Sequence, residues 1–251
     1  MNVPDSFDAL VPAWPAPRGV KALCTARRGG VSQGAFDSLN LGGHIGDDPA
    51  HVAENRARLH GALGVRPVFL QQVHGIDVLT LDAGTPDGAV ADACVAMQPG
   101  VACTIMVADC LPVLFADADG TRVAAAHAGW RGLAAGVLER TVAPFAVPAT
   151  TLAWLGPCIG PTAFEVGDEV KAAFEALSSD TARHFRPTGE PGKWWADLPG
   201  LARQRLQAAG ITQVFGNDGS DTWCTVRNPS RFFSHRRDRI SGRFAACIWL
   251  D

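Results

Sequence analysis

The stretch VACTIMVADCLPVLFADADGTRVAAAHAGWRG, Val101–Gly132, contains three apolar runs in close succession. We predict strands over Ala102–Val107, Val113–Ala116 and Val123–Ala126. Each run is continuously apolar, which is typical of strands that are covered on both faces. The residue pattern that follows the third run predicts a helix over about residues 132–142. The stretch therefore indicates a buried sheet with helical cover.

Similar apolar runs recur along the rest of the chain. They predict further strands at Val20–Thr25, Val68–Gln72, Val78–Leu81, Leu152–Leu155, Gln213–Phe215 and Phe244–Leu250. Helices interleave with these strands without strict alternation, so we expect an α/β or α+β fold with a mixed sheet covered by helices. No repeat, low-complexity tract or Pro/Ser-rich linker divides the chain, which predicts a single domain over residues 1–251.

Helix boundaries are marked by capping residues. A helix is predicted from the Asp48-Pro49 pair, an N-cap followed by a first helical proline, to a stop at Gly64. Asp168 and Asp197 are predicted to cap two further helices in the same way.

Positive and negative charges are nearly balanced, with 22 Lys and Arg against 25 Asp and Glu and a formal net charge of −3. Proteins that bind nucleic acid or anionic membranes generally carry a basic excess. The apolar runs are too short to span a bilayer, and the N-terminus lacks the basic and apolar regions of a signal peptide. We therefore expect neither nucleic acid nor a membrane as a partner.

The 7 cysteines are odd in number, scattered and without a CxxC pair. This usage is typical of a reducing compartment, in which thiols are core residues, ligands or nucleophiles. It predicts a soluble cytoplasmic protein. No pattern indicates a coiled coil or an obligate interface, so we expect a monomer.

Two histidines and one cysteine lie at or beyond the ends of predicted strands: His74 in QQVHG, Cys110 in VADC and His127 in HAGWRG. Two imidazoles and a thiolate form a good site for Zn²⁺, with the fourth position left to water as in catalytic zinc sites. Copper is a second candidate because His₂Cys sites accept both metals. The spacing matches no local metal motif, and each residue type is also common as a buried thiol or a hydrogen-bonded histidine.

Several carboxylates and arginines are further candidates. A carboxylate after an apolar run either caps a turn or orients a ligand histidine and moves protons. Arginines beside Gly-rich loops hold phosphate, although a charge run is more often solvated surface. The candidate catalytic residues are Asp92, Asp109 and Arg131, and the candidate substrate-binding residues are Arg27, Arg28, Gln72, Arg236 and Cys158, the last in a tight Gly-Pro turn.

The order of these motifs resembles that of the YfiH-like family. The resemblance rests on TARRGGVS, SLNLG, QQVHG, ADA, ADCLPV, HAGWRG, GPCIGP, FEVGDEV, SHRRD and SGR, and it covers the chain from about Val20 to its end. Members of this family were first labelled multicopper polyphenol oxidases (laccases) and are now described as purine nucleoside phosphorylases with adenosine deaminase activity. Bacterial relatives are also linked to the removal of wrongly built peptidoglycan precursors.

The resemblance implies a single-domain α/β sandwich of mixed sheets between helices, with His74, Cys110 and His127 as zinc ligands. The implied reactions are phosphorolysis of adenosine, inosine and methylthioadenosine, and hydrolytic deamination of adenosine. The implied partners are a purine nucleoside and phosphate. Composition argues against the older laccase label, because a multicopper oxidase needs on the order of ten histidines, usually in HxH pairs. This chain has 7 histidines and no HxH.

Three hypotheses follow. The first is a zinc-dependent purine nucleoside enzyme in which water activated by the metal attacks C6 of adenine, Asp92 or Asp109 moves protons, and the candidate arginines hold phosphate against C1′ of the ribose. The second is a metal-free thiol hydrolase acting on an amide or a peptidoglycan precursor, with Cys110 as nucleophile and His127 or His74 as its base. The third is a binding protein with an inactive pocket.

Overall fold

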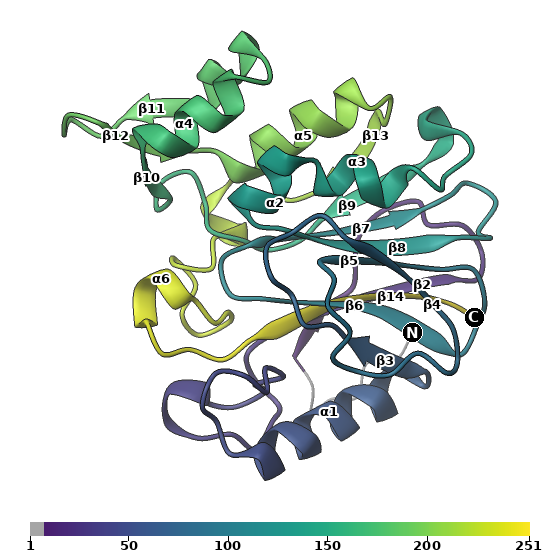
Figure 1. Ribbon diagram of the computed structural model, residues 1–251. Coiled ribbons are helices and arrows are strands. Elements are labelled where there is room, and N and C mark those ends of the chain that lie inside the picture. The colour runs from purple at the N-terminus through teal and green to yellow at the C-terminus, as the bar shows by residue number, and fades with distance from the viewer. Residues whose placement is uncertain (1–7) are drawn as a thin grey trace.

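Two β-sheets pack face to face at the centre of the molecule, and helices cover the outer face of each sheet (Figure 1). The computed structural model describes residues 8–251. Side chains between the two sheets form one apolar cluster, and the helices on each side enclose another against their own sheet. These four layers, in the order helix, sheet, sheet and helix, confirm the predicted α/β fold with mixed sheets covered by helices.

The first sheet combines strands from both ends of the described chain. Its strands, in spatial order, are β1 (Ala9–Leu10), β2 (Val20–Thr25), β14 (Phe244–Leu250), β6 (Val101–Val107) and β3 (Arg66–Phe69). Neighbouring strands are antiparallel except β3 and β6, which are parallel. Every residue of β14 and β6 is buried. Both strands are covered on two faces, which explains why their sequences are apolar without alternation.

The second sheet has six strands and is also mixed. Its strands, in spatial order, are β13 (Gln213–Gly216), β9 (Leu152–Leu155), β7 (Leu111–Ala116), β8 (Val123–Ala128), β5 (Ala93–Ala96) and β4 (Val78–Leu81). The outer pairs β13–β9 and β4–β5 are parallel, and the inner pairs are antiparallel. The stretch that predicted a buried sheet thus supplies β6 to one sheet and the central pair β7 and β8 to the other.

One long helix covers the first sheet, and three helices cover the second (Figure 1). They are α1 (Pro49–Leu63) on the first sheet and α2 (Trp130–Ala135), α3 (Val137–Val142) and α5 (Leu198–Ala208) on the second. The predicted caps of α1 and α5 are confirmed: the Asp48 carboxylate accepts from the N–H of Ala50, and that of Asp197 accepts from the N–H of Gly200.

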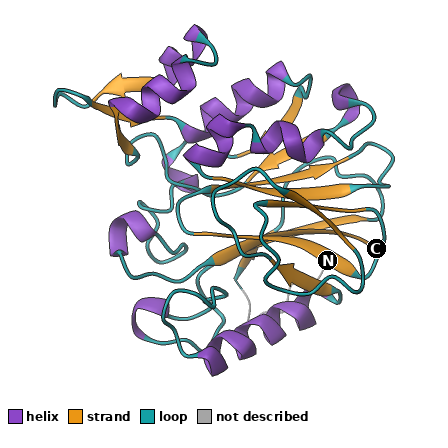
Figure 2. Cartoon of the chain, viewed as in Figure 1, coloured by secondary structure: helices purple, strands orange, loops and turns teal. Residues whose placement is uncertain are grey.

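A small antiparallel sheet with one helix lies beside α2 and α5 (Figure 2). It consists of β10 (Glu165–Gly167), β12 (Lys193–Ala196) and β11 (Phe185–Pro187), with α4 (Asp168–Glu175) following β10 directly. The short helix α6 (His235–Asp238) and the loops around it lie at one end of the two main sheets (Figure 1). Short 3₁₀-helices occur at Gly34–Phe36, Pro148–Thr150, Ser179–His184 and Asp221–Trp223.

Two predicted helix features are wrong. The helix expected over 132–142 is divided into α2 and α3, because Gly136 has a φ of +102° in the left-handed region and ends the first helix. Asp168 is not the N-cap of α4, since Gly167 occupies that position. The Asp168 carboxylate instead accepts a 2.7 Å hydrogen bond from Nε1 of Trp194, which ties α4 to β12.

Most boundaries of the predicted strands lie within two residues of the prediction, and the largest shift is at Val68–Gln72, which is observed as β3 over Arg66–Phe69. The strands β1, β5, β10, β11 and β12 are short and were not predicted; the last three form the small sheet. No helix among residues 8–251 has both the length and the apolar character that crossing a membrane requires.

Candidate metal centre

The three predicted metal ligands meet at the end of the sandwich where α6 lies. His74 is in the loop after β3, Cys110 is in the short connection from β6 to β7, and His127 is near the end of β8. Their ligand atoms lie within 4.8 Å of one another, and Cys110 Sγ is 3.7 Å from His74 Nε2. Since β6 and β7 belong to different sheets, the connection that carries Cys110 crosses the seam between them. The cluster therefore lies at that seam.

Asp92, fully buried just before β5, organises two of the three ligands. Its Oδ1 accepts from His127 Nδ1 at 2.8 Å and from the backbone N–H of His74 at 2.9 Å. Its Oδ2 accepts from the backbone N–H groups of Val73 at 3.1 Å and Gly75 at 2.6 Å. His74 has a φ of +62°, which is uncommon for a residue with a side chain. The three hydrogen bonds from Val73, His74 and Gly75 to this carboxylate hold the loop in its strained conformation.

The charge of Asp92 decides which nitrogen of His127 faces the other ligands. Burial disfavours the carboxylate, but hydrogen bonds from His127 and from the N–H of Gly75 outweigh it and lower the pKa of Asp92. Because His127 donates Nδ1–H to this anion, its Nε2 is directed to the site. A carboxylate that fixes the tautomer of a ligand histidine is a common feature of zinc sites.

Cys110 and His127 each stabilise the charged form of the other. Burial disfavours the Cys110 thiolate, but the charge and hydrogen bonds of His127 and His74 outweigh it and lower the pKa to about 6. Burial also disfavours the His127 imidazolium, yet Cys110 and Asp92 raise its pKa to about 9. At neutral pH the thiol is therefore ionised, and His127 carries a proton that a metal ion would displace.

The donor set and its surroundings fit a divalent ion such as zinc. One thiolate and two imidazoles are ligands that zinc favours, and three protein ligands leave a fourth position open. These three residues are the single group of this kind within residues 8–251. The backbone at Gly129 approaches the cluster closely: a Cβ there would lie 2.9 Å from both Cys110 Sγ and His74 Cδ2. A side chain at position 129 would therefore collide with Cys110 and His74, and glycine avoids this collision.

We expect Gly129→Ala to weaken zinc binding by about 10- to 100-fold, as is usual for changes that misplace metal ligands. The φ of Gly129 is −64°, which alanine adopts without strain, so the effect arises from crowding of Cys110 and His74. Competition with a chelating dye measures the affinity. Gly61→Ala, in open space on α1, is the matched control and should bind zinc as the wild type does. Equal affinities for the two variants would contradict the steric argument.

A cavity of about 420 Å³ opens onto the three ligands, and three other predicted site residues line it: Gln72, Asp109 and Arg236. The Gln72 side chain donates to the carbonyl of Met106 at 2.8 Å and accepts from its N–H at 2.9 Å. This pair of hydrogen bonds fastens the His74 loop to the end of β6.

Asp109 ties the crossing connection to the segment that contains α6. Its Oδ1 accepts from the Thr225 hydroxyl and its Oδ2 from the backbone N–H of Arg236, both at 2.6 Å. The Arg236 side chain donates to the carbonyl of Glu165 at 3.0 Å and lies 5.6 Å from the ring centre of Phe164. Arg236 therefore spans the rim of the cavity.

Arg27 and Arg28, two of the predicted substrate-binding residues, are not among the residues that line this cavity. Arg27 donates through Nε to the carbonyl of Asp37 at 2.7 Å and through Nη1 to that of Pro229 at 3.0 Å. Arg28 is exposed. The first arginine thus joins two loops, and the second faces solvent.

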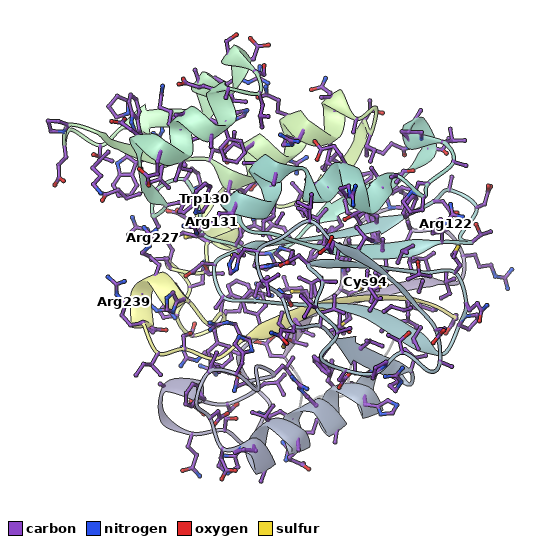
Figure 3. The ribbon with its side chains drawn as sticks, in the orientation of Figure 1. Cys94, Arg122, Trp130, Arg131, Arg227 and Arg239 are labelled. Carbon is purple, nitrogen blue, oxygen red and sulfur yellow. The ribbon has the colours of Figure 1, made fainter. Side chains whose placement is uncertain are left out.

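Arg131 and Cys158 also lie outside the cavity lining. The Arg131 guanidinium stacks 4.4 Å from the ring centre of Trp130, and both residues are labelled at the start of α2 in Figure 3. Cys158 is fully buried, and its sulfur accepts from the Asn217 side chain at 3.4 Å. Burial raises the pKa of this thiol well above its ordinary value. Cys158 is therefore a structural residue of the Gly-Pro turn.

The structure adds residues to the site that were not predicted. They are His44, Trp130, Phe164, His235, Arg239 and Arg243, all of which line the cavity. Figure 3 shows Trp130, on α2, and Arg239, just after α6, on the same side of the molecule. The basic residues lie in GGHIGD and in the segment SHRRDRISGR, in which Arg239 stands between the motifs SHRRD and SGR. Basic motifs that could have pointed to these residues are thus present in the sequence. Local sequence does not show, however, which arginines of such motifs face the cavity.

The chain is similar to known proteins over nearly its whole length. A family model described as multi-copper polyphenol oxidoreductase laccase matches residues 21–251. Purine nucleoside phosphorylase PA4543 of Pseudomonas aeruginosa is 55% identical over 244 residues, covering 96% of this chain and 98% of the relative. Purine nucleoside phosphorylase YfiH of Escherichia coli is 53% identical with the same coverage.

Solved structures agree with these relatives. The crystal structure of Neisseria meningitidis protein NMB0706 superposes with a TM-score of 0.91 at 48% identity, covering 97% of this chain and 99% of that one. YfiH of Bacillus licheniformis superposes with a TM-score of 0.87 at 31% identity, covering 92% and 93%. The fold, the His–Cys–His cluster and the relatives agree. The chain is therefore a member of the YfiH family.

Proposed function

We propose that the protein is a zinc-dependent purine nucleoside phosphorylase that cleaves adenosine, inosine and methylthioadenosine and also deaminates adenosine. The observation that carries this proposal is the meeting of a His–Cys–His cluster with basic side chains in one cavity. The cavity, about 420 Å³, lies within the range of small-molecule sites, which is roughly 300–1,000 Å³. The names of the relatives in Pseudomonas aeruginosa and Escherichia coli support the phosphorylase reaction.

Zinc held by His74, Cys110 and His127 would supply Lewis-acid chemistry, including activation of water at neutral pH. In phosphorolysis, a phosphate oxygen bonds to C1′ of the ribose while the bond from C1′ to the purine breaks. Asp109 is the one carboxylate among the cavity-lining residues of the described chain, and we assign it the transfer of a proton to the leaving purine or ammonia. Asp92 holds two of the ligands in place and does not face the cavity.

The wall of the cavity near α2 and β10 suits an aromatic base. Trp130 and Phe164 line it with their rings, and Ile159 and Leu198 add apolar surface. A flat purine gains from stacking and from apolar burial against such side chains. We therefore place the base against this wall and the ribose nearer to the metal ligands.

Incubating the zinc-loaded protein with adenosine, with and without phosphate, tests the proposal. Adenine should form only when phosphate is present, because phosphorolysis consumes it. Inosine should form with or without phosphate, since deamination is a hydrolysis, and hypoxanthine should again require phosphate. Chromatography resolves the three products. If none of them forms, the protein does not act on these nucleosides.

The thiol hydrolase hypothesis is retained as a second candidate because Cys110 has a pKa of about 6 beside His127. A thiolate paired with a histidine is the reactive form in cysteine hydrolases. Chelation separates the two candidates: a zinc enzyme loses activity and regains it when zinc is restored, whereas a thiol hydrolase is indifferent to chelation and is inactivated by alkylation of Cys110. A multicopper oxidase finds no support, because it needs further copper sites and residues 8–251 hold one cluster of possible ligands.

A further inference from the structure

Five basic side chains line the cavity without a carboxylate partner. They are His44, His235, Arg236, Arg239 and Arg243, and none of them takes part in an ion pair within residues 8–251. Asp109, the acidic lining residue, has both carboxylate oxygens engaged by the Thr225 hydroxyl and by a backbone N–H. Three of the five are arginines, and positive charge in a concave site concentrates anions. The cavity therefore has side chains suited to bind one.

Arg243, at the beginning of β14, is the most firmly positioned of these five. Its backbone N–H donates to Oδ1 of Asn40 at 2.9 Å, and its carbonyl accepts from the N–H of Leu41 at 3.0 Å. Its Nη1 donates to the carbonyls of Ser241 at 2.7 Å and Gly242 at 3.0 Å. Its Nε and Nη2 make no hydrogen bond to any residue in the described part of the chain, and neither atom is a buried unsatisfied group. Both remain available to a ligand in the cavity.

The SLNLGG segment explains why Arg243 takes this position. Asn40 is fully buried and also donates to Oδ2 of Asp47 at 2.8 Å, while its carbonyl accepts from the side chain of Asn55 at 2.9 Å. Gly42 lies against the arginine, because a Cβ there would be 2.8 Å from Arg243 Cγ. This buried polar network holds the loop over residues 40–47 against the backbone of Arg243, whose side chain lines the cavity.

His44 lies in the same loop and lines the same cavity as Arg243. Burial lowers the pKa of His44, and the charges of Arg243 and Arg56 lower it further. A neutral imidazole still offers one N–H to a phosphate oxygen. Arg243 lines the same cavity as the three candidate metal ligands.

We propose that Arg243 and His44 form the subsite for inorganic phosphate in this cavity. A planar guanidinium with two free N–H groups matches two oxygens of a phosphate dianion. Arg236 is less suited to this role, because its guanidinium already donates to the carbonyl of Glu165 and lies over Phe164. The assignment rests on the proposed phosphorylase function, in which phosphate must approach C1′ of a ribose that lies beside the metal ligands.

Titration of inorganic phosphate into the zinc-loaded protein, without nucleoside, tests the subsite directly. We expect Arg243→Met to raise the Kd for phosphate by about 10- to 100-fold, the range for losing a charge-assisted pair of hydrogen bonds. Arg243→Lys should restore part of this loss, and His44→Gln should raise the Kd by about 3- to 10-fold. In turnover, the KM for phosphate should rise in parallel, with a much smaller change in the KM for adenosine.

Arg18→Met is the matched control, because Arg18 is exposed and lies outside the cavity lining. It should bind phosphate as the wild type does. If Arg243→Met binds phosphate with wild-type affinity while Cys110→Ala does not, phosphate binds at the metal and the subsite is overturned. If Arg243→Met fails to fold in a thermal unfolding scan, Arg243→Lys and His44→Gln decide the question, and wild-type affinity in both overturns it.

The same experiment separates this inference from the proposed function. Phosphate binding requires no turnover, so weakened binding by Arg243→Met supports the subsite even when the wild type forms no product from nucleosides. In that case the phosphorylase function alone fails. The converse outcome is also distinct. If the wild type forms adenine from adenosine and phosphate, the function is supported. If Arg243→Met then has an unchanged Kd and KM for phosphate, the subsite is overturned.

Discussion

Cys110→Ala is expected to lose its zinc and to lower kcat/KM for adenosine phosphorolysis by about a thousandfold or more, which corresponds to roughly 4 kcal/mol of transition-state stabilisation. Cys110 is the one anionic ligand of the cluster, and its pKa of about 6 provides the thiolate at neutral pH. The two remaining imidazoles are a weak pair of ligands for zinc. Cys110 is only half-buried in a connection between strands, so the fold should persist.

Metal analysis and product formation should be measured together on this variant. Cys247→Ala is the matched control, because Cys247 is buried under α1, away from the cavity, and its loss should lower stability while zinc and turnover persist. Full turnover by metal-free Cys110→Ala would exclude the His–Cys–His cluster as the metal centre. Loss of turnover with zinc retained would instead favour the hypothesis of a thiol nucleophile.

The clustering of His74, Cys110 and His127 could be predicted from the sequence because each stands at or beyond the end of a buried strand, within a recognisable motif. Their spacing alone carried little information: Cys110 and His74 are 36 positions apart in the chain. They meet because the chain changes sheets between β6 and β7, which brings the end of one sheet against the other. Apolar patterning predicts each strand, but it does not show which strands belong to the same sheet.

The substrate side of the cavity could not be predicted in the same way. Arg243 is held in place by a hydrogen bond to Asn40, 203 positions away, and nothing near either residue in sequence indicates that contact. Arg27 and Arg28 stand beside a Gly-rich loop, a pattern that is compatible with phosphate binding. Backbone carbonyls satisfy the first instead, and solvent surrounds the second. Which way an arginine turns is decided by tertiary hydrogen bonds.

Asp92→Asn is expected to lower zinc affinity by about 10- to 100-fold and the free energy of unfolding by about 2–4 kcal/mol. The Asp92 carboxylate accepts four hydrogen bonds, two at each oxygen, from three backbone N–H groups and from His127. An asparagine amide has one accepting oxygen, and its NH₂ group would face N–H donors. At least two donors then lose their acceptor, the loop at His74 is released from its positive φ, and His127 loses the partner that directs Nε2 to the metal.

Asp109→Asn makes the same chemical change beside the same cluster and is the matched control for metal content and stability. An asparagine there retains both contacts, since its oxygen accepts from the N–H of Arg236 and its NH₂ group donates to the Thr225 hydroxyl. Dye competition and thermal unfolding should therefore separate the two variants. Equal losses of zinc affinity and stability in the two variants would show that these properties depend on negative charge near the cluster and not on the hydrogen-bond geometry of Asp92. If the four hydrogen bonds that Asp92 accepts hold the ligands in place, only Asp92→Asn should show a large loss of zinc affinity and stability.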